Sequence, residues 1–156
     1  MQPRLDLTKH LNTNLGRAML ALSTETAGAL DHTLFELVKI RASQVNQCAY
    51  CIDMHTKDAR AHGETEQRIY ALSAWRETPF FSARERAALE WTEELTRLAD
   101  RDVADDLYER VKAELGEADL VALTFAIVVI NGWNRIAKPF RAPAGTYQPA
   151  QAAAVV

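Results

Sequence analysis

Apolar residues recur along the chain at the intervals that place side chains on one face of a helix. The first such series runs through Leu7, Leu11, Leu15, Met19 and Leu22. It predicts an amphipathic helix that ends near Gly28, a residue type that often follows a helix C-terminus. No segment shows a convincing two-residue alternation of a half-buried strand, so the pattern indicates an all-helical fold.

Capping residues divide the middle of the chain. Asp31 is suited to cap a second helix, because its carboxylate can accept hydrogen bonds from first-turn N–H groups. The Asn-Gln pair at 46–47 is a weak stop signal, and a third helix is expected from Cys48 to Gly63. A short fourth helix, which ends before Pro79, is marked by Ile69, Leu72 and Trp75.

Three further helices are expected in the second half of the chain. Ser82 and Glu85 have the spacing of a capping box, which predicts the start of a fifth helix. Its inward-facing residues are expected to be Leu89, Thr92, Leu95 and Ala99. Asp102 can cap a sixth helix that Gly116 closes. A seventh helix, from about 117 to 132, is apolar on every side, so we expect it to be buried on every side, as the central core helix or within a subunit interface.

These elements predict an all-α, single-domain helical bundle of about seven helices over residues 1–140. A length of 156 residues suits one domain with a single hydrophobic core. After Pro139 the composition shifts to alanine, proline and glycine. We therefore predict that residues 141–156 form a C-terminal arm or a disordered tail.

Composition and charge narrow the function classes. Apolar residues make up 48% of the chain, charged residues 25%, and the net charge is −3, so neither a nucleic-acid nor an anionic-membrane partner is expected. The longest apolar stretch, Leu120 to Ile130, is shorter than the ~20 residues of a membrane span. The N-terminal residues lack the apolar core of a signal peptide. A cytoplasmic location is the resulting expectation.

The two cysteines of the chain lie three residues apart, at Cys48 and Cys51, and His55 follows. A secreted disulfide scaffold would carry more cysteines, spread more widely, so this pair indicates redox chemistry or metal binding. On a helix the three side chains fall within a sector about 60° wide. Cys51 and His55 are then neighbours one turn apart, and the two cysteines can form a disulfide if Cys48 lies in a frayed first turn.

Two effects could activate a thiol here, and they favour different cysteines. The partial positive charge of the helix N-terminus favours a thiolate at Cys48, although it contributes only ~0.3–1 kcal/mol when exposed. His55 can accept a proton from Cys51 and then pair with its thiolate, which is a larger effect in a dry site. We therefore predict that Cys51 attacks the oxidant and that Cys48 resolves the resulting sulfenic acid as a disulfide.

Glu36 is a further candidate. A turn at residues 46–47 would fold the second helix back antiparallel to the third. Glu36, Ile40, Ser43 and Gln47 would then form one stripe that could lie beside His55. From there Glu36 could orient the imidazole or pass a proton through water.

Other interpretations compete with this redox site. The cysteines could be two buried apolar thiols, or could bind zinc together with His55 and His62. Structural zinc prefers four ligands, usually from two chain segments, whereas these residues crowd one helix face, so neither a metal nor another cofactor is predicted. A thioredoxin domain would require a strand before the motif, and the sequence on both sides is helical.

The arrangement of Glu36 followed by Cys48-x-x-Cys51-x-x-x-His55 resembles the signature of the alkylhydroperoxidase D / carboxymuconolactone decarboxylase family. Segments 40–44, 59–63 and 131–135 add to the resemblance, which covers roughly residues 10 to 138. It implies an all-helical fold, homo-oligomers (dimers, trimers or hexamers), and reduction of hydroperoxides by a cysteine pair that a dithiol partner re-reduces. It also implies that Cys51 forms the sulfenic acid, that Cys48 is the resolving, proton-donating cysteine, and that His55 and Glu36 form a proton relay.

One position departs from the family prototype, which has a histidine where this chain has Tyr50. A phenol titrates far above a histidine and cannot take its acid–base role near neutral pH. The decarboxylase branch lacks the cysteine pair, so lactone decarboxylation is not expected. The predicted function is a thiol-dependent peroxidase or disulfide oxidoreductase, and the alternative is a redox-responsive interaction module without efficient turnover.

Overall fold

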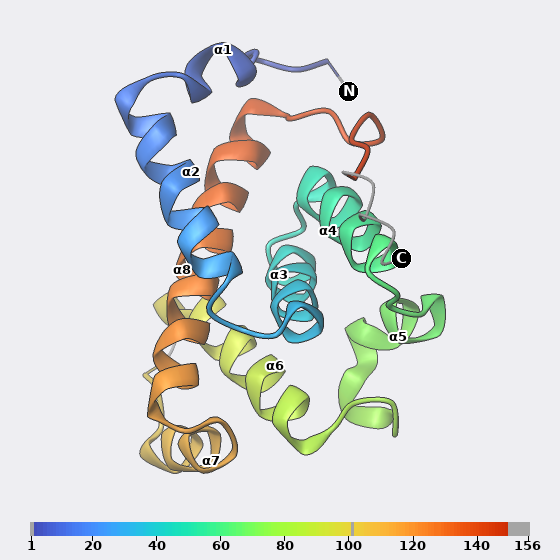
Figure 1. The fold of residues 1–156 in the computed structure, drawn as a ribbon, viewed down its shortest axis with the longest axis vertical. Coiled ribbons are helices and arrows are strands. Elements are labelled where there is room, and N and C mark those ends of the chain that lie inside the picture. Colours follow the sequence, from blue (N-terminus) through green and yellow to red (C-terminus); the bar gives the residue numbers. More distant parts are fainter. Residues whose placement is uncertain (1, 101, 150–156) are drawn as a thin grey trace, which may run out of the picture.

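Helix α8 (Glu117–Phe140) is the longest element of the structure, and α2, α3, α4, α6 and α7 pack against it (Figure 1). The structure, a computed structural model, describes residues 2–100 and 102–149. Over these ranges the chain forms helices and connecting turns without a strand, which confirms the all-α prediction. The remaining α-helices are α1 (Thr8–Leu11), α2 (Asn14–Ala27), α3 (His32–Val45), α4 (Ala49–Ala61), α5 (Glu66–Ala71), α6 (Ala83–Thr96) and α7 (Asp105–Leu115). Two 3₁₀ segments, η1 (Leu72–Glu77) and η2 (Leu98–Asp100), follow α5 and α6.

The side chains that the sequence indicated cap two helices, α3 and α6, and the predicted start of α4 at Cys48 also agrees with the structure. The Asp31 side chain accepts a hydrogen bond from a first-turn N–H of α3. Ser82 and Glu85 form the reciprocal capping box of α6, and Cys48 is the N-cap residue of α4. These interactions join residues three positions apart or fewer, so they form wherever the local sequence permits them.

The first predicted helix is broken into two. Thr13 caps α2 by accepting a hydrogen bond from the N–H of Gly16, which ends α1 after a single turn. A Cβ atom at position 16 would overlap the carbonyl oxygen of Leu11. The sharp bend between α1 and α2 therefore requires glycine at this position.

Two expectations near α6 and α7 are wrong. Ala104, not Asp102, is the N-cap of α7, and no side-chain hydrogen bond caps this helix. Ala99 is exposed, because the chain leaves α6 after Thr96 and enters the 3₁₀ turn η2. The inward positions Leu89 and Thr92 of α6 are confirmed, since both are fully buried.

Helix α8 continues eight residues beyond the predicted end at Gly132. Its last turns are held by buried polar contacts: the Asn134 amide donates to Ser43 Oγ at 3.1 Å and accepts from Asn46 at 2.8 Å. At Gly132 the Met19 methyl of α2 packs close to the α8 backbone, and a Cβ atom there would lie 2.7 Å from it, so this methyl would have to move. Contacts with other helices, rather than local propensity, thus extend α8.

Length and composition alone would allow α8 to cross a membrane. In the fold it packs against α2, α3, α4, α6 and α7, as the core helix of a bundle does. Its other side is open: Val121, Phe125 and Val128 are exposed by 56%, 51% and 55%. The expectation of burial on every side is therefore wrong for a single chain.

Helices α3 and α4 form an antiparallel hairpin, as expected from the turn at residues 46–47. Gln47 adopts a left-handed conformation (φ +54°) that reverses the chain. The start of α3 lies beside the end of α4, since Leu37 and Ala59 share one core cluster, whereas Ala42 packs with Cys48 in another. The hairpin brings Glu36 alongside the second half of α4.

Arg41 interrupts the apolar face of α3. Its Nε donates to Glu93 of α6 at 2.7 Å, and Glu93 also accepts from Trp75 and Arg76. Glu93 therefore neutralises the charge of Arg41 within the chain. Its contacts join α3, α6 and η1.

After α8, residues 142–149 fold back over α4. Gly145 N–H donates to Asp53 at 2.9 Å, Lys57 donates to the Tyr147 carbonyl at 2.9 Å, and the Tyr147 hydroxyl donates to Asp58 at 2.7 Å. We refer to residues 142–149 as the C-terminal strap. The rest of the predicted arm or tail, residues 150–156, lies outside the described residues.

Candidate active site

The two cysteines lie at the N-terminus of α4, with Cys48 as the cap and Cys51 in the first turn. Their sulfur atoms are 2.7 Å apart, and both residues are free thiols about 1% exposed. Ala42, Ile130 and Ala137 pack against them from α3 and α8. The two sulfurs therefore lie next to each other as thiols, in a largely apolar setting.

The two thiols differ in acidity. The hydrogen bond from Cys51 lowers the pKa of Cys48 to about 7 against the opposing effect of burial, and Lys138 and Asn134 lower it further. The same contact, together with burial, raises the pKa of Cys51. Of the two thiols, Cys48 is therefore the one that ionises first as the pH rises, while Cys51 remains a thiol.

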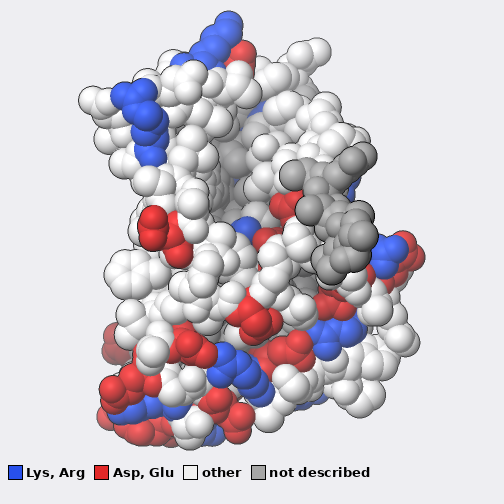
Figure 2. Space-filling model, viewed as in Figure 1, with Lys and Arg blue, Asp and Glu red and all other residues white. Residues whose placement is uncertain are grey.

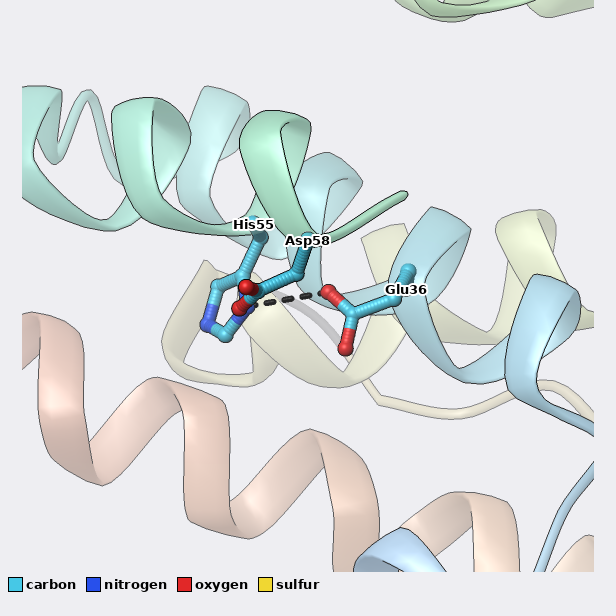
Figure 3. A group of neighbouring side chains, drawn as sticks. All are labelled: Glu36, His55 and Asp58. Atoms are coloured by element: carbon cyan, nitrogen blue, oxygen red, sulfur yellow. Dashed lines mark hydrogen bonds and ion pairs between the residues drawn. The ribbon is translucent and has the colours of Figure 1, made fainter. Parts of the chain in front are cut away.

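His55 and Glu36 form a second buried pair, 4% and 3% exposed, that links α4 to α3 (Figure 3). His55 Nδ1 lies 3.0 Å from Glu36 Oε2. A carboxylate can only accept, so Nδ1 carries the proton and Nε2 keeps a free lone pair. Figure 3 shows this second ring nitrogen pointing away from Glu36. The imidazole is thus held in the tautomer that can accept a proton.

Burial and salt-bridge partners set the charges of this pair. Burial lowers the pKa of His55 despite the opposing hydrogen bond to Glu36, so the ring is neutral at pH 7. Burial raises the pKa of Glu36, but the hydrogen bond with His55 and the nearby Lys39 lower it by more. Lys39 Nζ lies 2.9 Å from Glu36 Oε1. Glu36 is therefore an ionised carboxylate with a partner on each oxygen.

All four predicted residues lie in one buried region, but as two separate pairs. His55 follows Cys51 by one helical turn, and both are buried residues of α4. Among residues 2–100 and 102–149 no hydrogen bond joins the imidazole to either sulfur. In the resting arrangement a proton would therefore pass between the pairs by side-chain movement or through water.

Three residues beside this region were missed by sequence reasoning. Asn134 lowers the pKa of both cysteines by hydrogen bonding. Asp58 Oδ2 lies 3.9 Å from His55 Nδ1, and its other oxygen accepts from the Tyr147 hydroxyl. The spacing of Asp58, three residues after His55, could have indicated its position. Tyr147 gave no signal, because its segment has no periodicity.

Side chains of metal-binding type meet at Glu36, His55 and Asp58, whose nearest ligand atoms lie within 4.8 Å of one another. The cysteines are not part of this group. The second oxygens of the two carboxylates are engaged by Lys39 and Tyr147. The group is therefore better described as a hydrogen-bonded pair, His55 and Glu36, with the Asp58 carboxylate beside it at 3.9 Å. His62, the fourth candidate zinc ligand, stacks on His32 with ring centroids 3.7 Å apart.

Residues 10–94 match the carboxymuconolactone decarboxylase family, and this range contains Glu36, both cysteines and His55. The chain belongs to this family. Its relatives include the uncharacterized protein YdfG of Bacillus subtilis, 53% identical over 108 residues, which span 69% of this chain and 74% of YdfG. The uncharacterized protein YnjA of Escherichia coli is 30% identical over 102 residues, or 65% of this chain and 56% of YnjA.

Solved structures of related proteins confirm the alkylhydroperoxidase D-like fold. A crystal structure from Agrobacterium tumefaciens, of a protein of unknown function provisionally named an antioxidant defence protein AhpD, superposes with a TM-score of 0.88. It is 37% identical, over 94% of this chain and all of the other. The debrominase Bmp8 superposes with a TM-score of 0.78 at 16% identity, over 90% of this chain and 76% of Bmp8. At that identity the likeness shows the fold alone.

Any substrate of the two cysteines would have to reach their sulfur atoms. Figure 2 shows that the face viewed is hollowed in its upper half, between the side formed by α2 and α8 and the side formed by α4. Charged side chains gather on the lower half of this face, and few surround the hollow. Because both sulfurs are nearly inaccessible, a small rearrangement at the first turn of α4 would be needed to admit a substrate.

Proposed function

We propose that this protein is a thiol-dependent peroxidase or disulfide oxidoreductase that reduces hydroperoxides with Cys48 and Cys51 and is re-reduced by a dithiol partner. The observation that carries the proposal is the 2.7 Å separation of the two sulfurs at a helix N-terminus. Membership of a family with alkylhydroperoxidase D-like members supports it. The buried pair of His55 and Glu36 supplies the proton acceptor that thiol chemistry requires.

The proposed reaction begins when the proton of Cys51 moves to the Cys48 thiolate, or to His55 Nε2 where Cys48 is still a thiol, so that Cys48 carries a proton in either case. The Cys51 thiolate attacks one peroxide oxygen, an S–O bond forms, the O–O bond breaks, and the alkoxide takes a proton from Cys48. The Cys48 thiolate then attacks the sulfenic acid, and a disulfide and hydroxide result. A proton converts the hydroxide to water. Two thiols and one hydroperoxide thus give one disulfide, one alcohol and one water.

The acidities of the two thiols suit these roles. The pKa of Cys48, about 7, makes it an efficient proton donor to the alkoxide and a thiolate for the resolving step. The pKa of Cys51 is raised, and a more basic thiolate is intrinsically the stronger nucleophile. Cys51 therefore remains our proposed attacking sulfur, although Cys48 is the more acidic thiol before substrate binds.

Tyr50 stands where the prototype has a histidine, and burial with nearby negative charge raises the pKa of its phenol. The phenol stays protonated near neutral pH and cannot relay protons as a histidine does. In this chain the relay is therefore proposed to depend on His55 and Glu36.

The burial of both sulfurs favours a second candidate function, a redox-responsive interaction module. A site about 1% exposed would react slowly with bulky oxidants, and the change from two thiols to a disulfide would then serve as a signal. This alternative predicts that oxidation alters oligomer size or partner binding without catalytic turnover.

The test is peroxide oxidation of the purified, reduced protein, followed by thiol titration in the wild type, Cys51→Ser, Cys48→Ser and His55→Ala. His62→Ala is the matched control for His55→Ala, because it removes an exposed histidine at the end of the same helix. We expect fast oxidation to be lost in Cys51→Ser. Cys48→Ser should still form a sulfenic acid but no intramolecular disulfide.

The outcomes separate the hypotheses. Loss of fast oxidation only in Cys48→Ser would reverse the roles of the two cysteines. Absence of turnover with every hydroperoxide and dithiol tried would contradict the peroxidase and favour the interaction module.

We also propose that the protein forms homo-oligomers and acts in the cytoplasm. Support for the oligomer comes from the exposed apolar side chains of α8 and from Leu15 of α2, which is 85% exposed. Such residues rarely gather on the surface of a monomer without a partner.

A further inference from the structure

A network of polar contacts extends from His55 to the C-terminal strap. Asp58 Oδ2 lies 3.9 Å from His55 Nδ1, and Asp58 Oδ1 accepts a hydrogen bond from the Tyr147 hydroxyl at 2.7 Å. The strap thus reaches the imidazole through one intervening carboxylate. The residues that match the family end at position 94, so this contribution comes from a part of the chain outside the matched region.

We infer that Tyr147 is a positioning residue that holds the Asp58 carboxylate beside His55 and thereby sets the basicity of the imidazole. The inference rests on the proposed function for its kinetic consequence, whereas its effect on His55 can be measured without any activity. Three contacts of the strap with α4, at Asp53, Lys57 and Asp58, keep Tyr147 in place.

Tyr147 can serve only as a hydrogen-bond donor in this position. Burial and the neighbouring Asp58 carboxylate raise the pKa of its phenol, so the hydroxyl keeps its proton. A neutral donor fixes the carboxylate without cancelling its charge. Asp58 is half-buried, with 20% of its side chain exposed, and without Tyr147 it could turn towards water.

The position of Asp58 matters because few charged groups face His55. Glu36 and Lys39 face it from α3, Asp58 from α4 itself, and Tyr147 from the strap. From α8, Lys138 and Asn134 act on the sulfurs. Asp58 favours the protonated imidazole and Lys39 opposes it. Removing or releasing the Asp58 charge should therefore lower the pKa of His55 and weaken it as a proton acceptor.

The experiment compares the full-length wild type with Asp58→Asn, Tyr147→Phe and the control Tyr108→Phe, which removes a hydroxyl from α7. The titration of His55 is followed by imidazole ¹⁵N NMR, with its signals assigned from a His55→Gln variant. The rate of peroxide oxidation of the reduced thiols is measured over the same pH range.

We expect the titration midpoint of His55 to fall in Asp58→Asn and, by less, in Tyr147→Phe, and to stay unchanged in Tyr108→Phe. Oxidation at neutral pH should slow about tenfold in Asp58→Asn and about threefold in Tyr147→Phe, since one pKa unit corresponds to a factor of ten. The phenylalanine variant keeps the aromatic ring, so it changes the packing little. A shift of the His55 titration would therefore come from the lost hydroxyl.

An unchanged His55 titration in Tyr147→Phe would overturn the inference, whatever the oxidation rates. An inactive wild type would instead contradict the proposed peroxidase, and the NMR midpoints would still decide whether Tyr147 acts on His55. The two failures are therefore distinguishable.

Discussion

Glu36 Oε2 lies 3.0 Å from His55 Nδ1, although 19 residues separate the two in the sequence. The contact joins α3 to α4 across the hairpin and leaves the opposite ring nitrogen free. It therefore gives a buried, neutral imidazole a fixed orientation one turn from a pair of thiols. A serine–histidine–carboxylate triad orients its base in the same way.

Replacing Glu36 by glutamine should impair this orientation. An amide keeps the volume but loses the charge that stabilises an imidazolium, so we expect thiol oxidation by peroxide to slow by about 10²-fold. Stopped-flow measurement of thiol loss checks this. Glu66→Gln, at an exposed residue of α5 that pairs with Arg60, is the control. Equal rates for Glu36→Gln and wild type would show that the carboxylate is not part of the reaction.

Buried His55 should also make the protein less stable in mild acid. Burial lowers the folded-state pKa of His55 below its ordinary value of 6.5, so the unfolded chain binds the proton more readily. Stability is then fully present above about pH 6.5 and is lost as the pH falls towards the folded-state pKa. Urea unfolding at pH 7, 6 and 5 measures the effect.

His32 contributes with the same sign, because burial and nearby His62 also lower its pKa. His55→Gln and His32→Gln should therefore each flatten the dependence of the unfolding free energy on pH, with the larger effect for the buried His55. If neither substitution changes the pH dependence of the unfolding free energy, groups other than His55 and His32 cause the acid sensitivity.

Glu93 joins three elements and should be important for stability. It accepts hydrogen bonds from Arg41, Trp75 and Arg76, and it is buried. In Glu93→Gln the largely buried Arg41 loses its counter-charge, which should lower the unfolding free energy by about 3–5 kcal/mol. Urea denaturation measures the loss.

The matched control for Glu93→Gln is Glu90→Gln. Glu90 lies on the same helix and pairs with Arg110 at the surface, and exposed pairs of this kind contribute about 0–1 kcal/mol. Equal losses in the two variants would show that the Glu93 network does not stabilise the fold.

The open side of α8 should mediate self-association. A charge at Phe125, which is about half exposed, would be desolvated in any contact that covers this side, so Phe125→Glu should shift the protein towards monomers. Sedimentation velocity gives the mass, and circular dichroism checks that the helices persist. The control is Tyr70→Glu, at an exposed residue of α5. If Phe125→Glu keeps the oligomer mass of the wild type, the open side of α8 does not form the interface.

Local signals allowed much of the fold to be predicted. Asp31 and the Ser82–Glu85 capping box act on backbone groups within three residues, so the sequence contains the whole interaction. The end of α8 depends instead on Ser43 and Asn46, which meet Asn134 only after folding. No pattern near residue 132 indicates that the helix continues.

The candidate site likewise combines residues that local spacing predicts with residues that only the fold brings together. The CxxC pair and His55 share a face of one helix, which spacing alone predicts. Glu36 required a turn in the right place and a family resemblance. Tyr147 lies 89 residues from its partner Asp58, in a segment without a helical pattern, so the sequence gave no reason to expect it near the site.

The N-cap position of Cys48 has a consequence for the helix that it begins. A thiolate there offsets the positive end of the α4 dipole, and a disulfide would remove that charge. Oxidation should therefore loosen the first turn of α4, and the amide hydrogens of residues 49–52 should exchange with solvent faster. Hydrogen exchange at one helix end would then report the redox state of the protein.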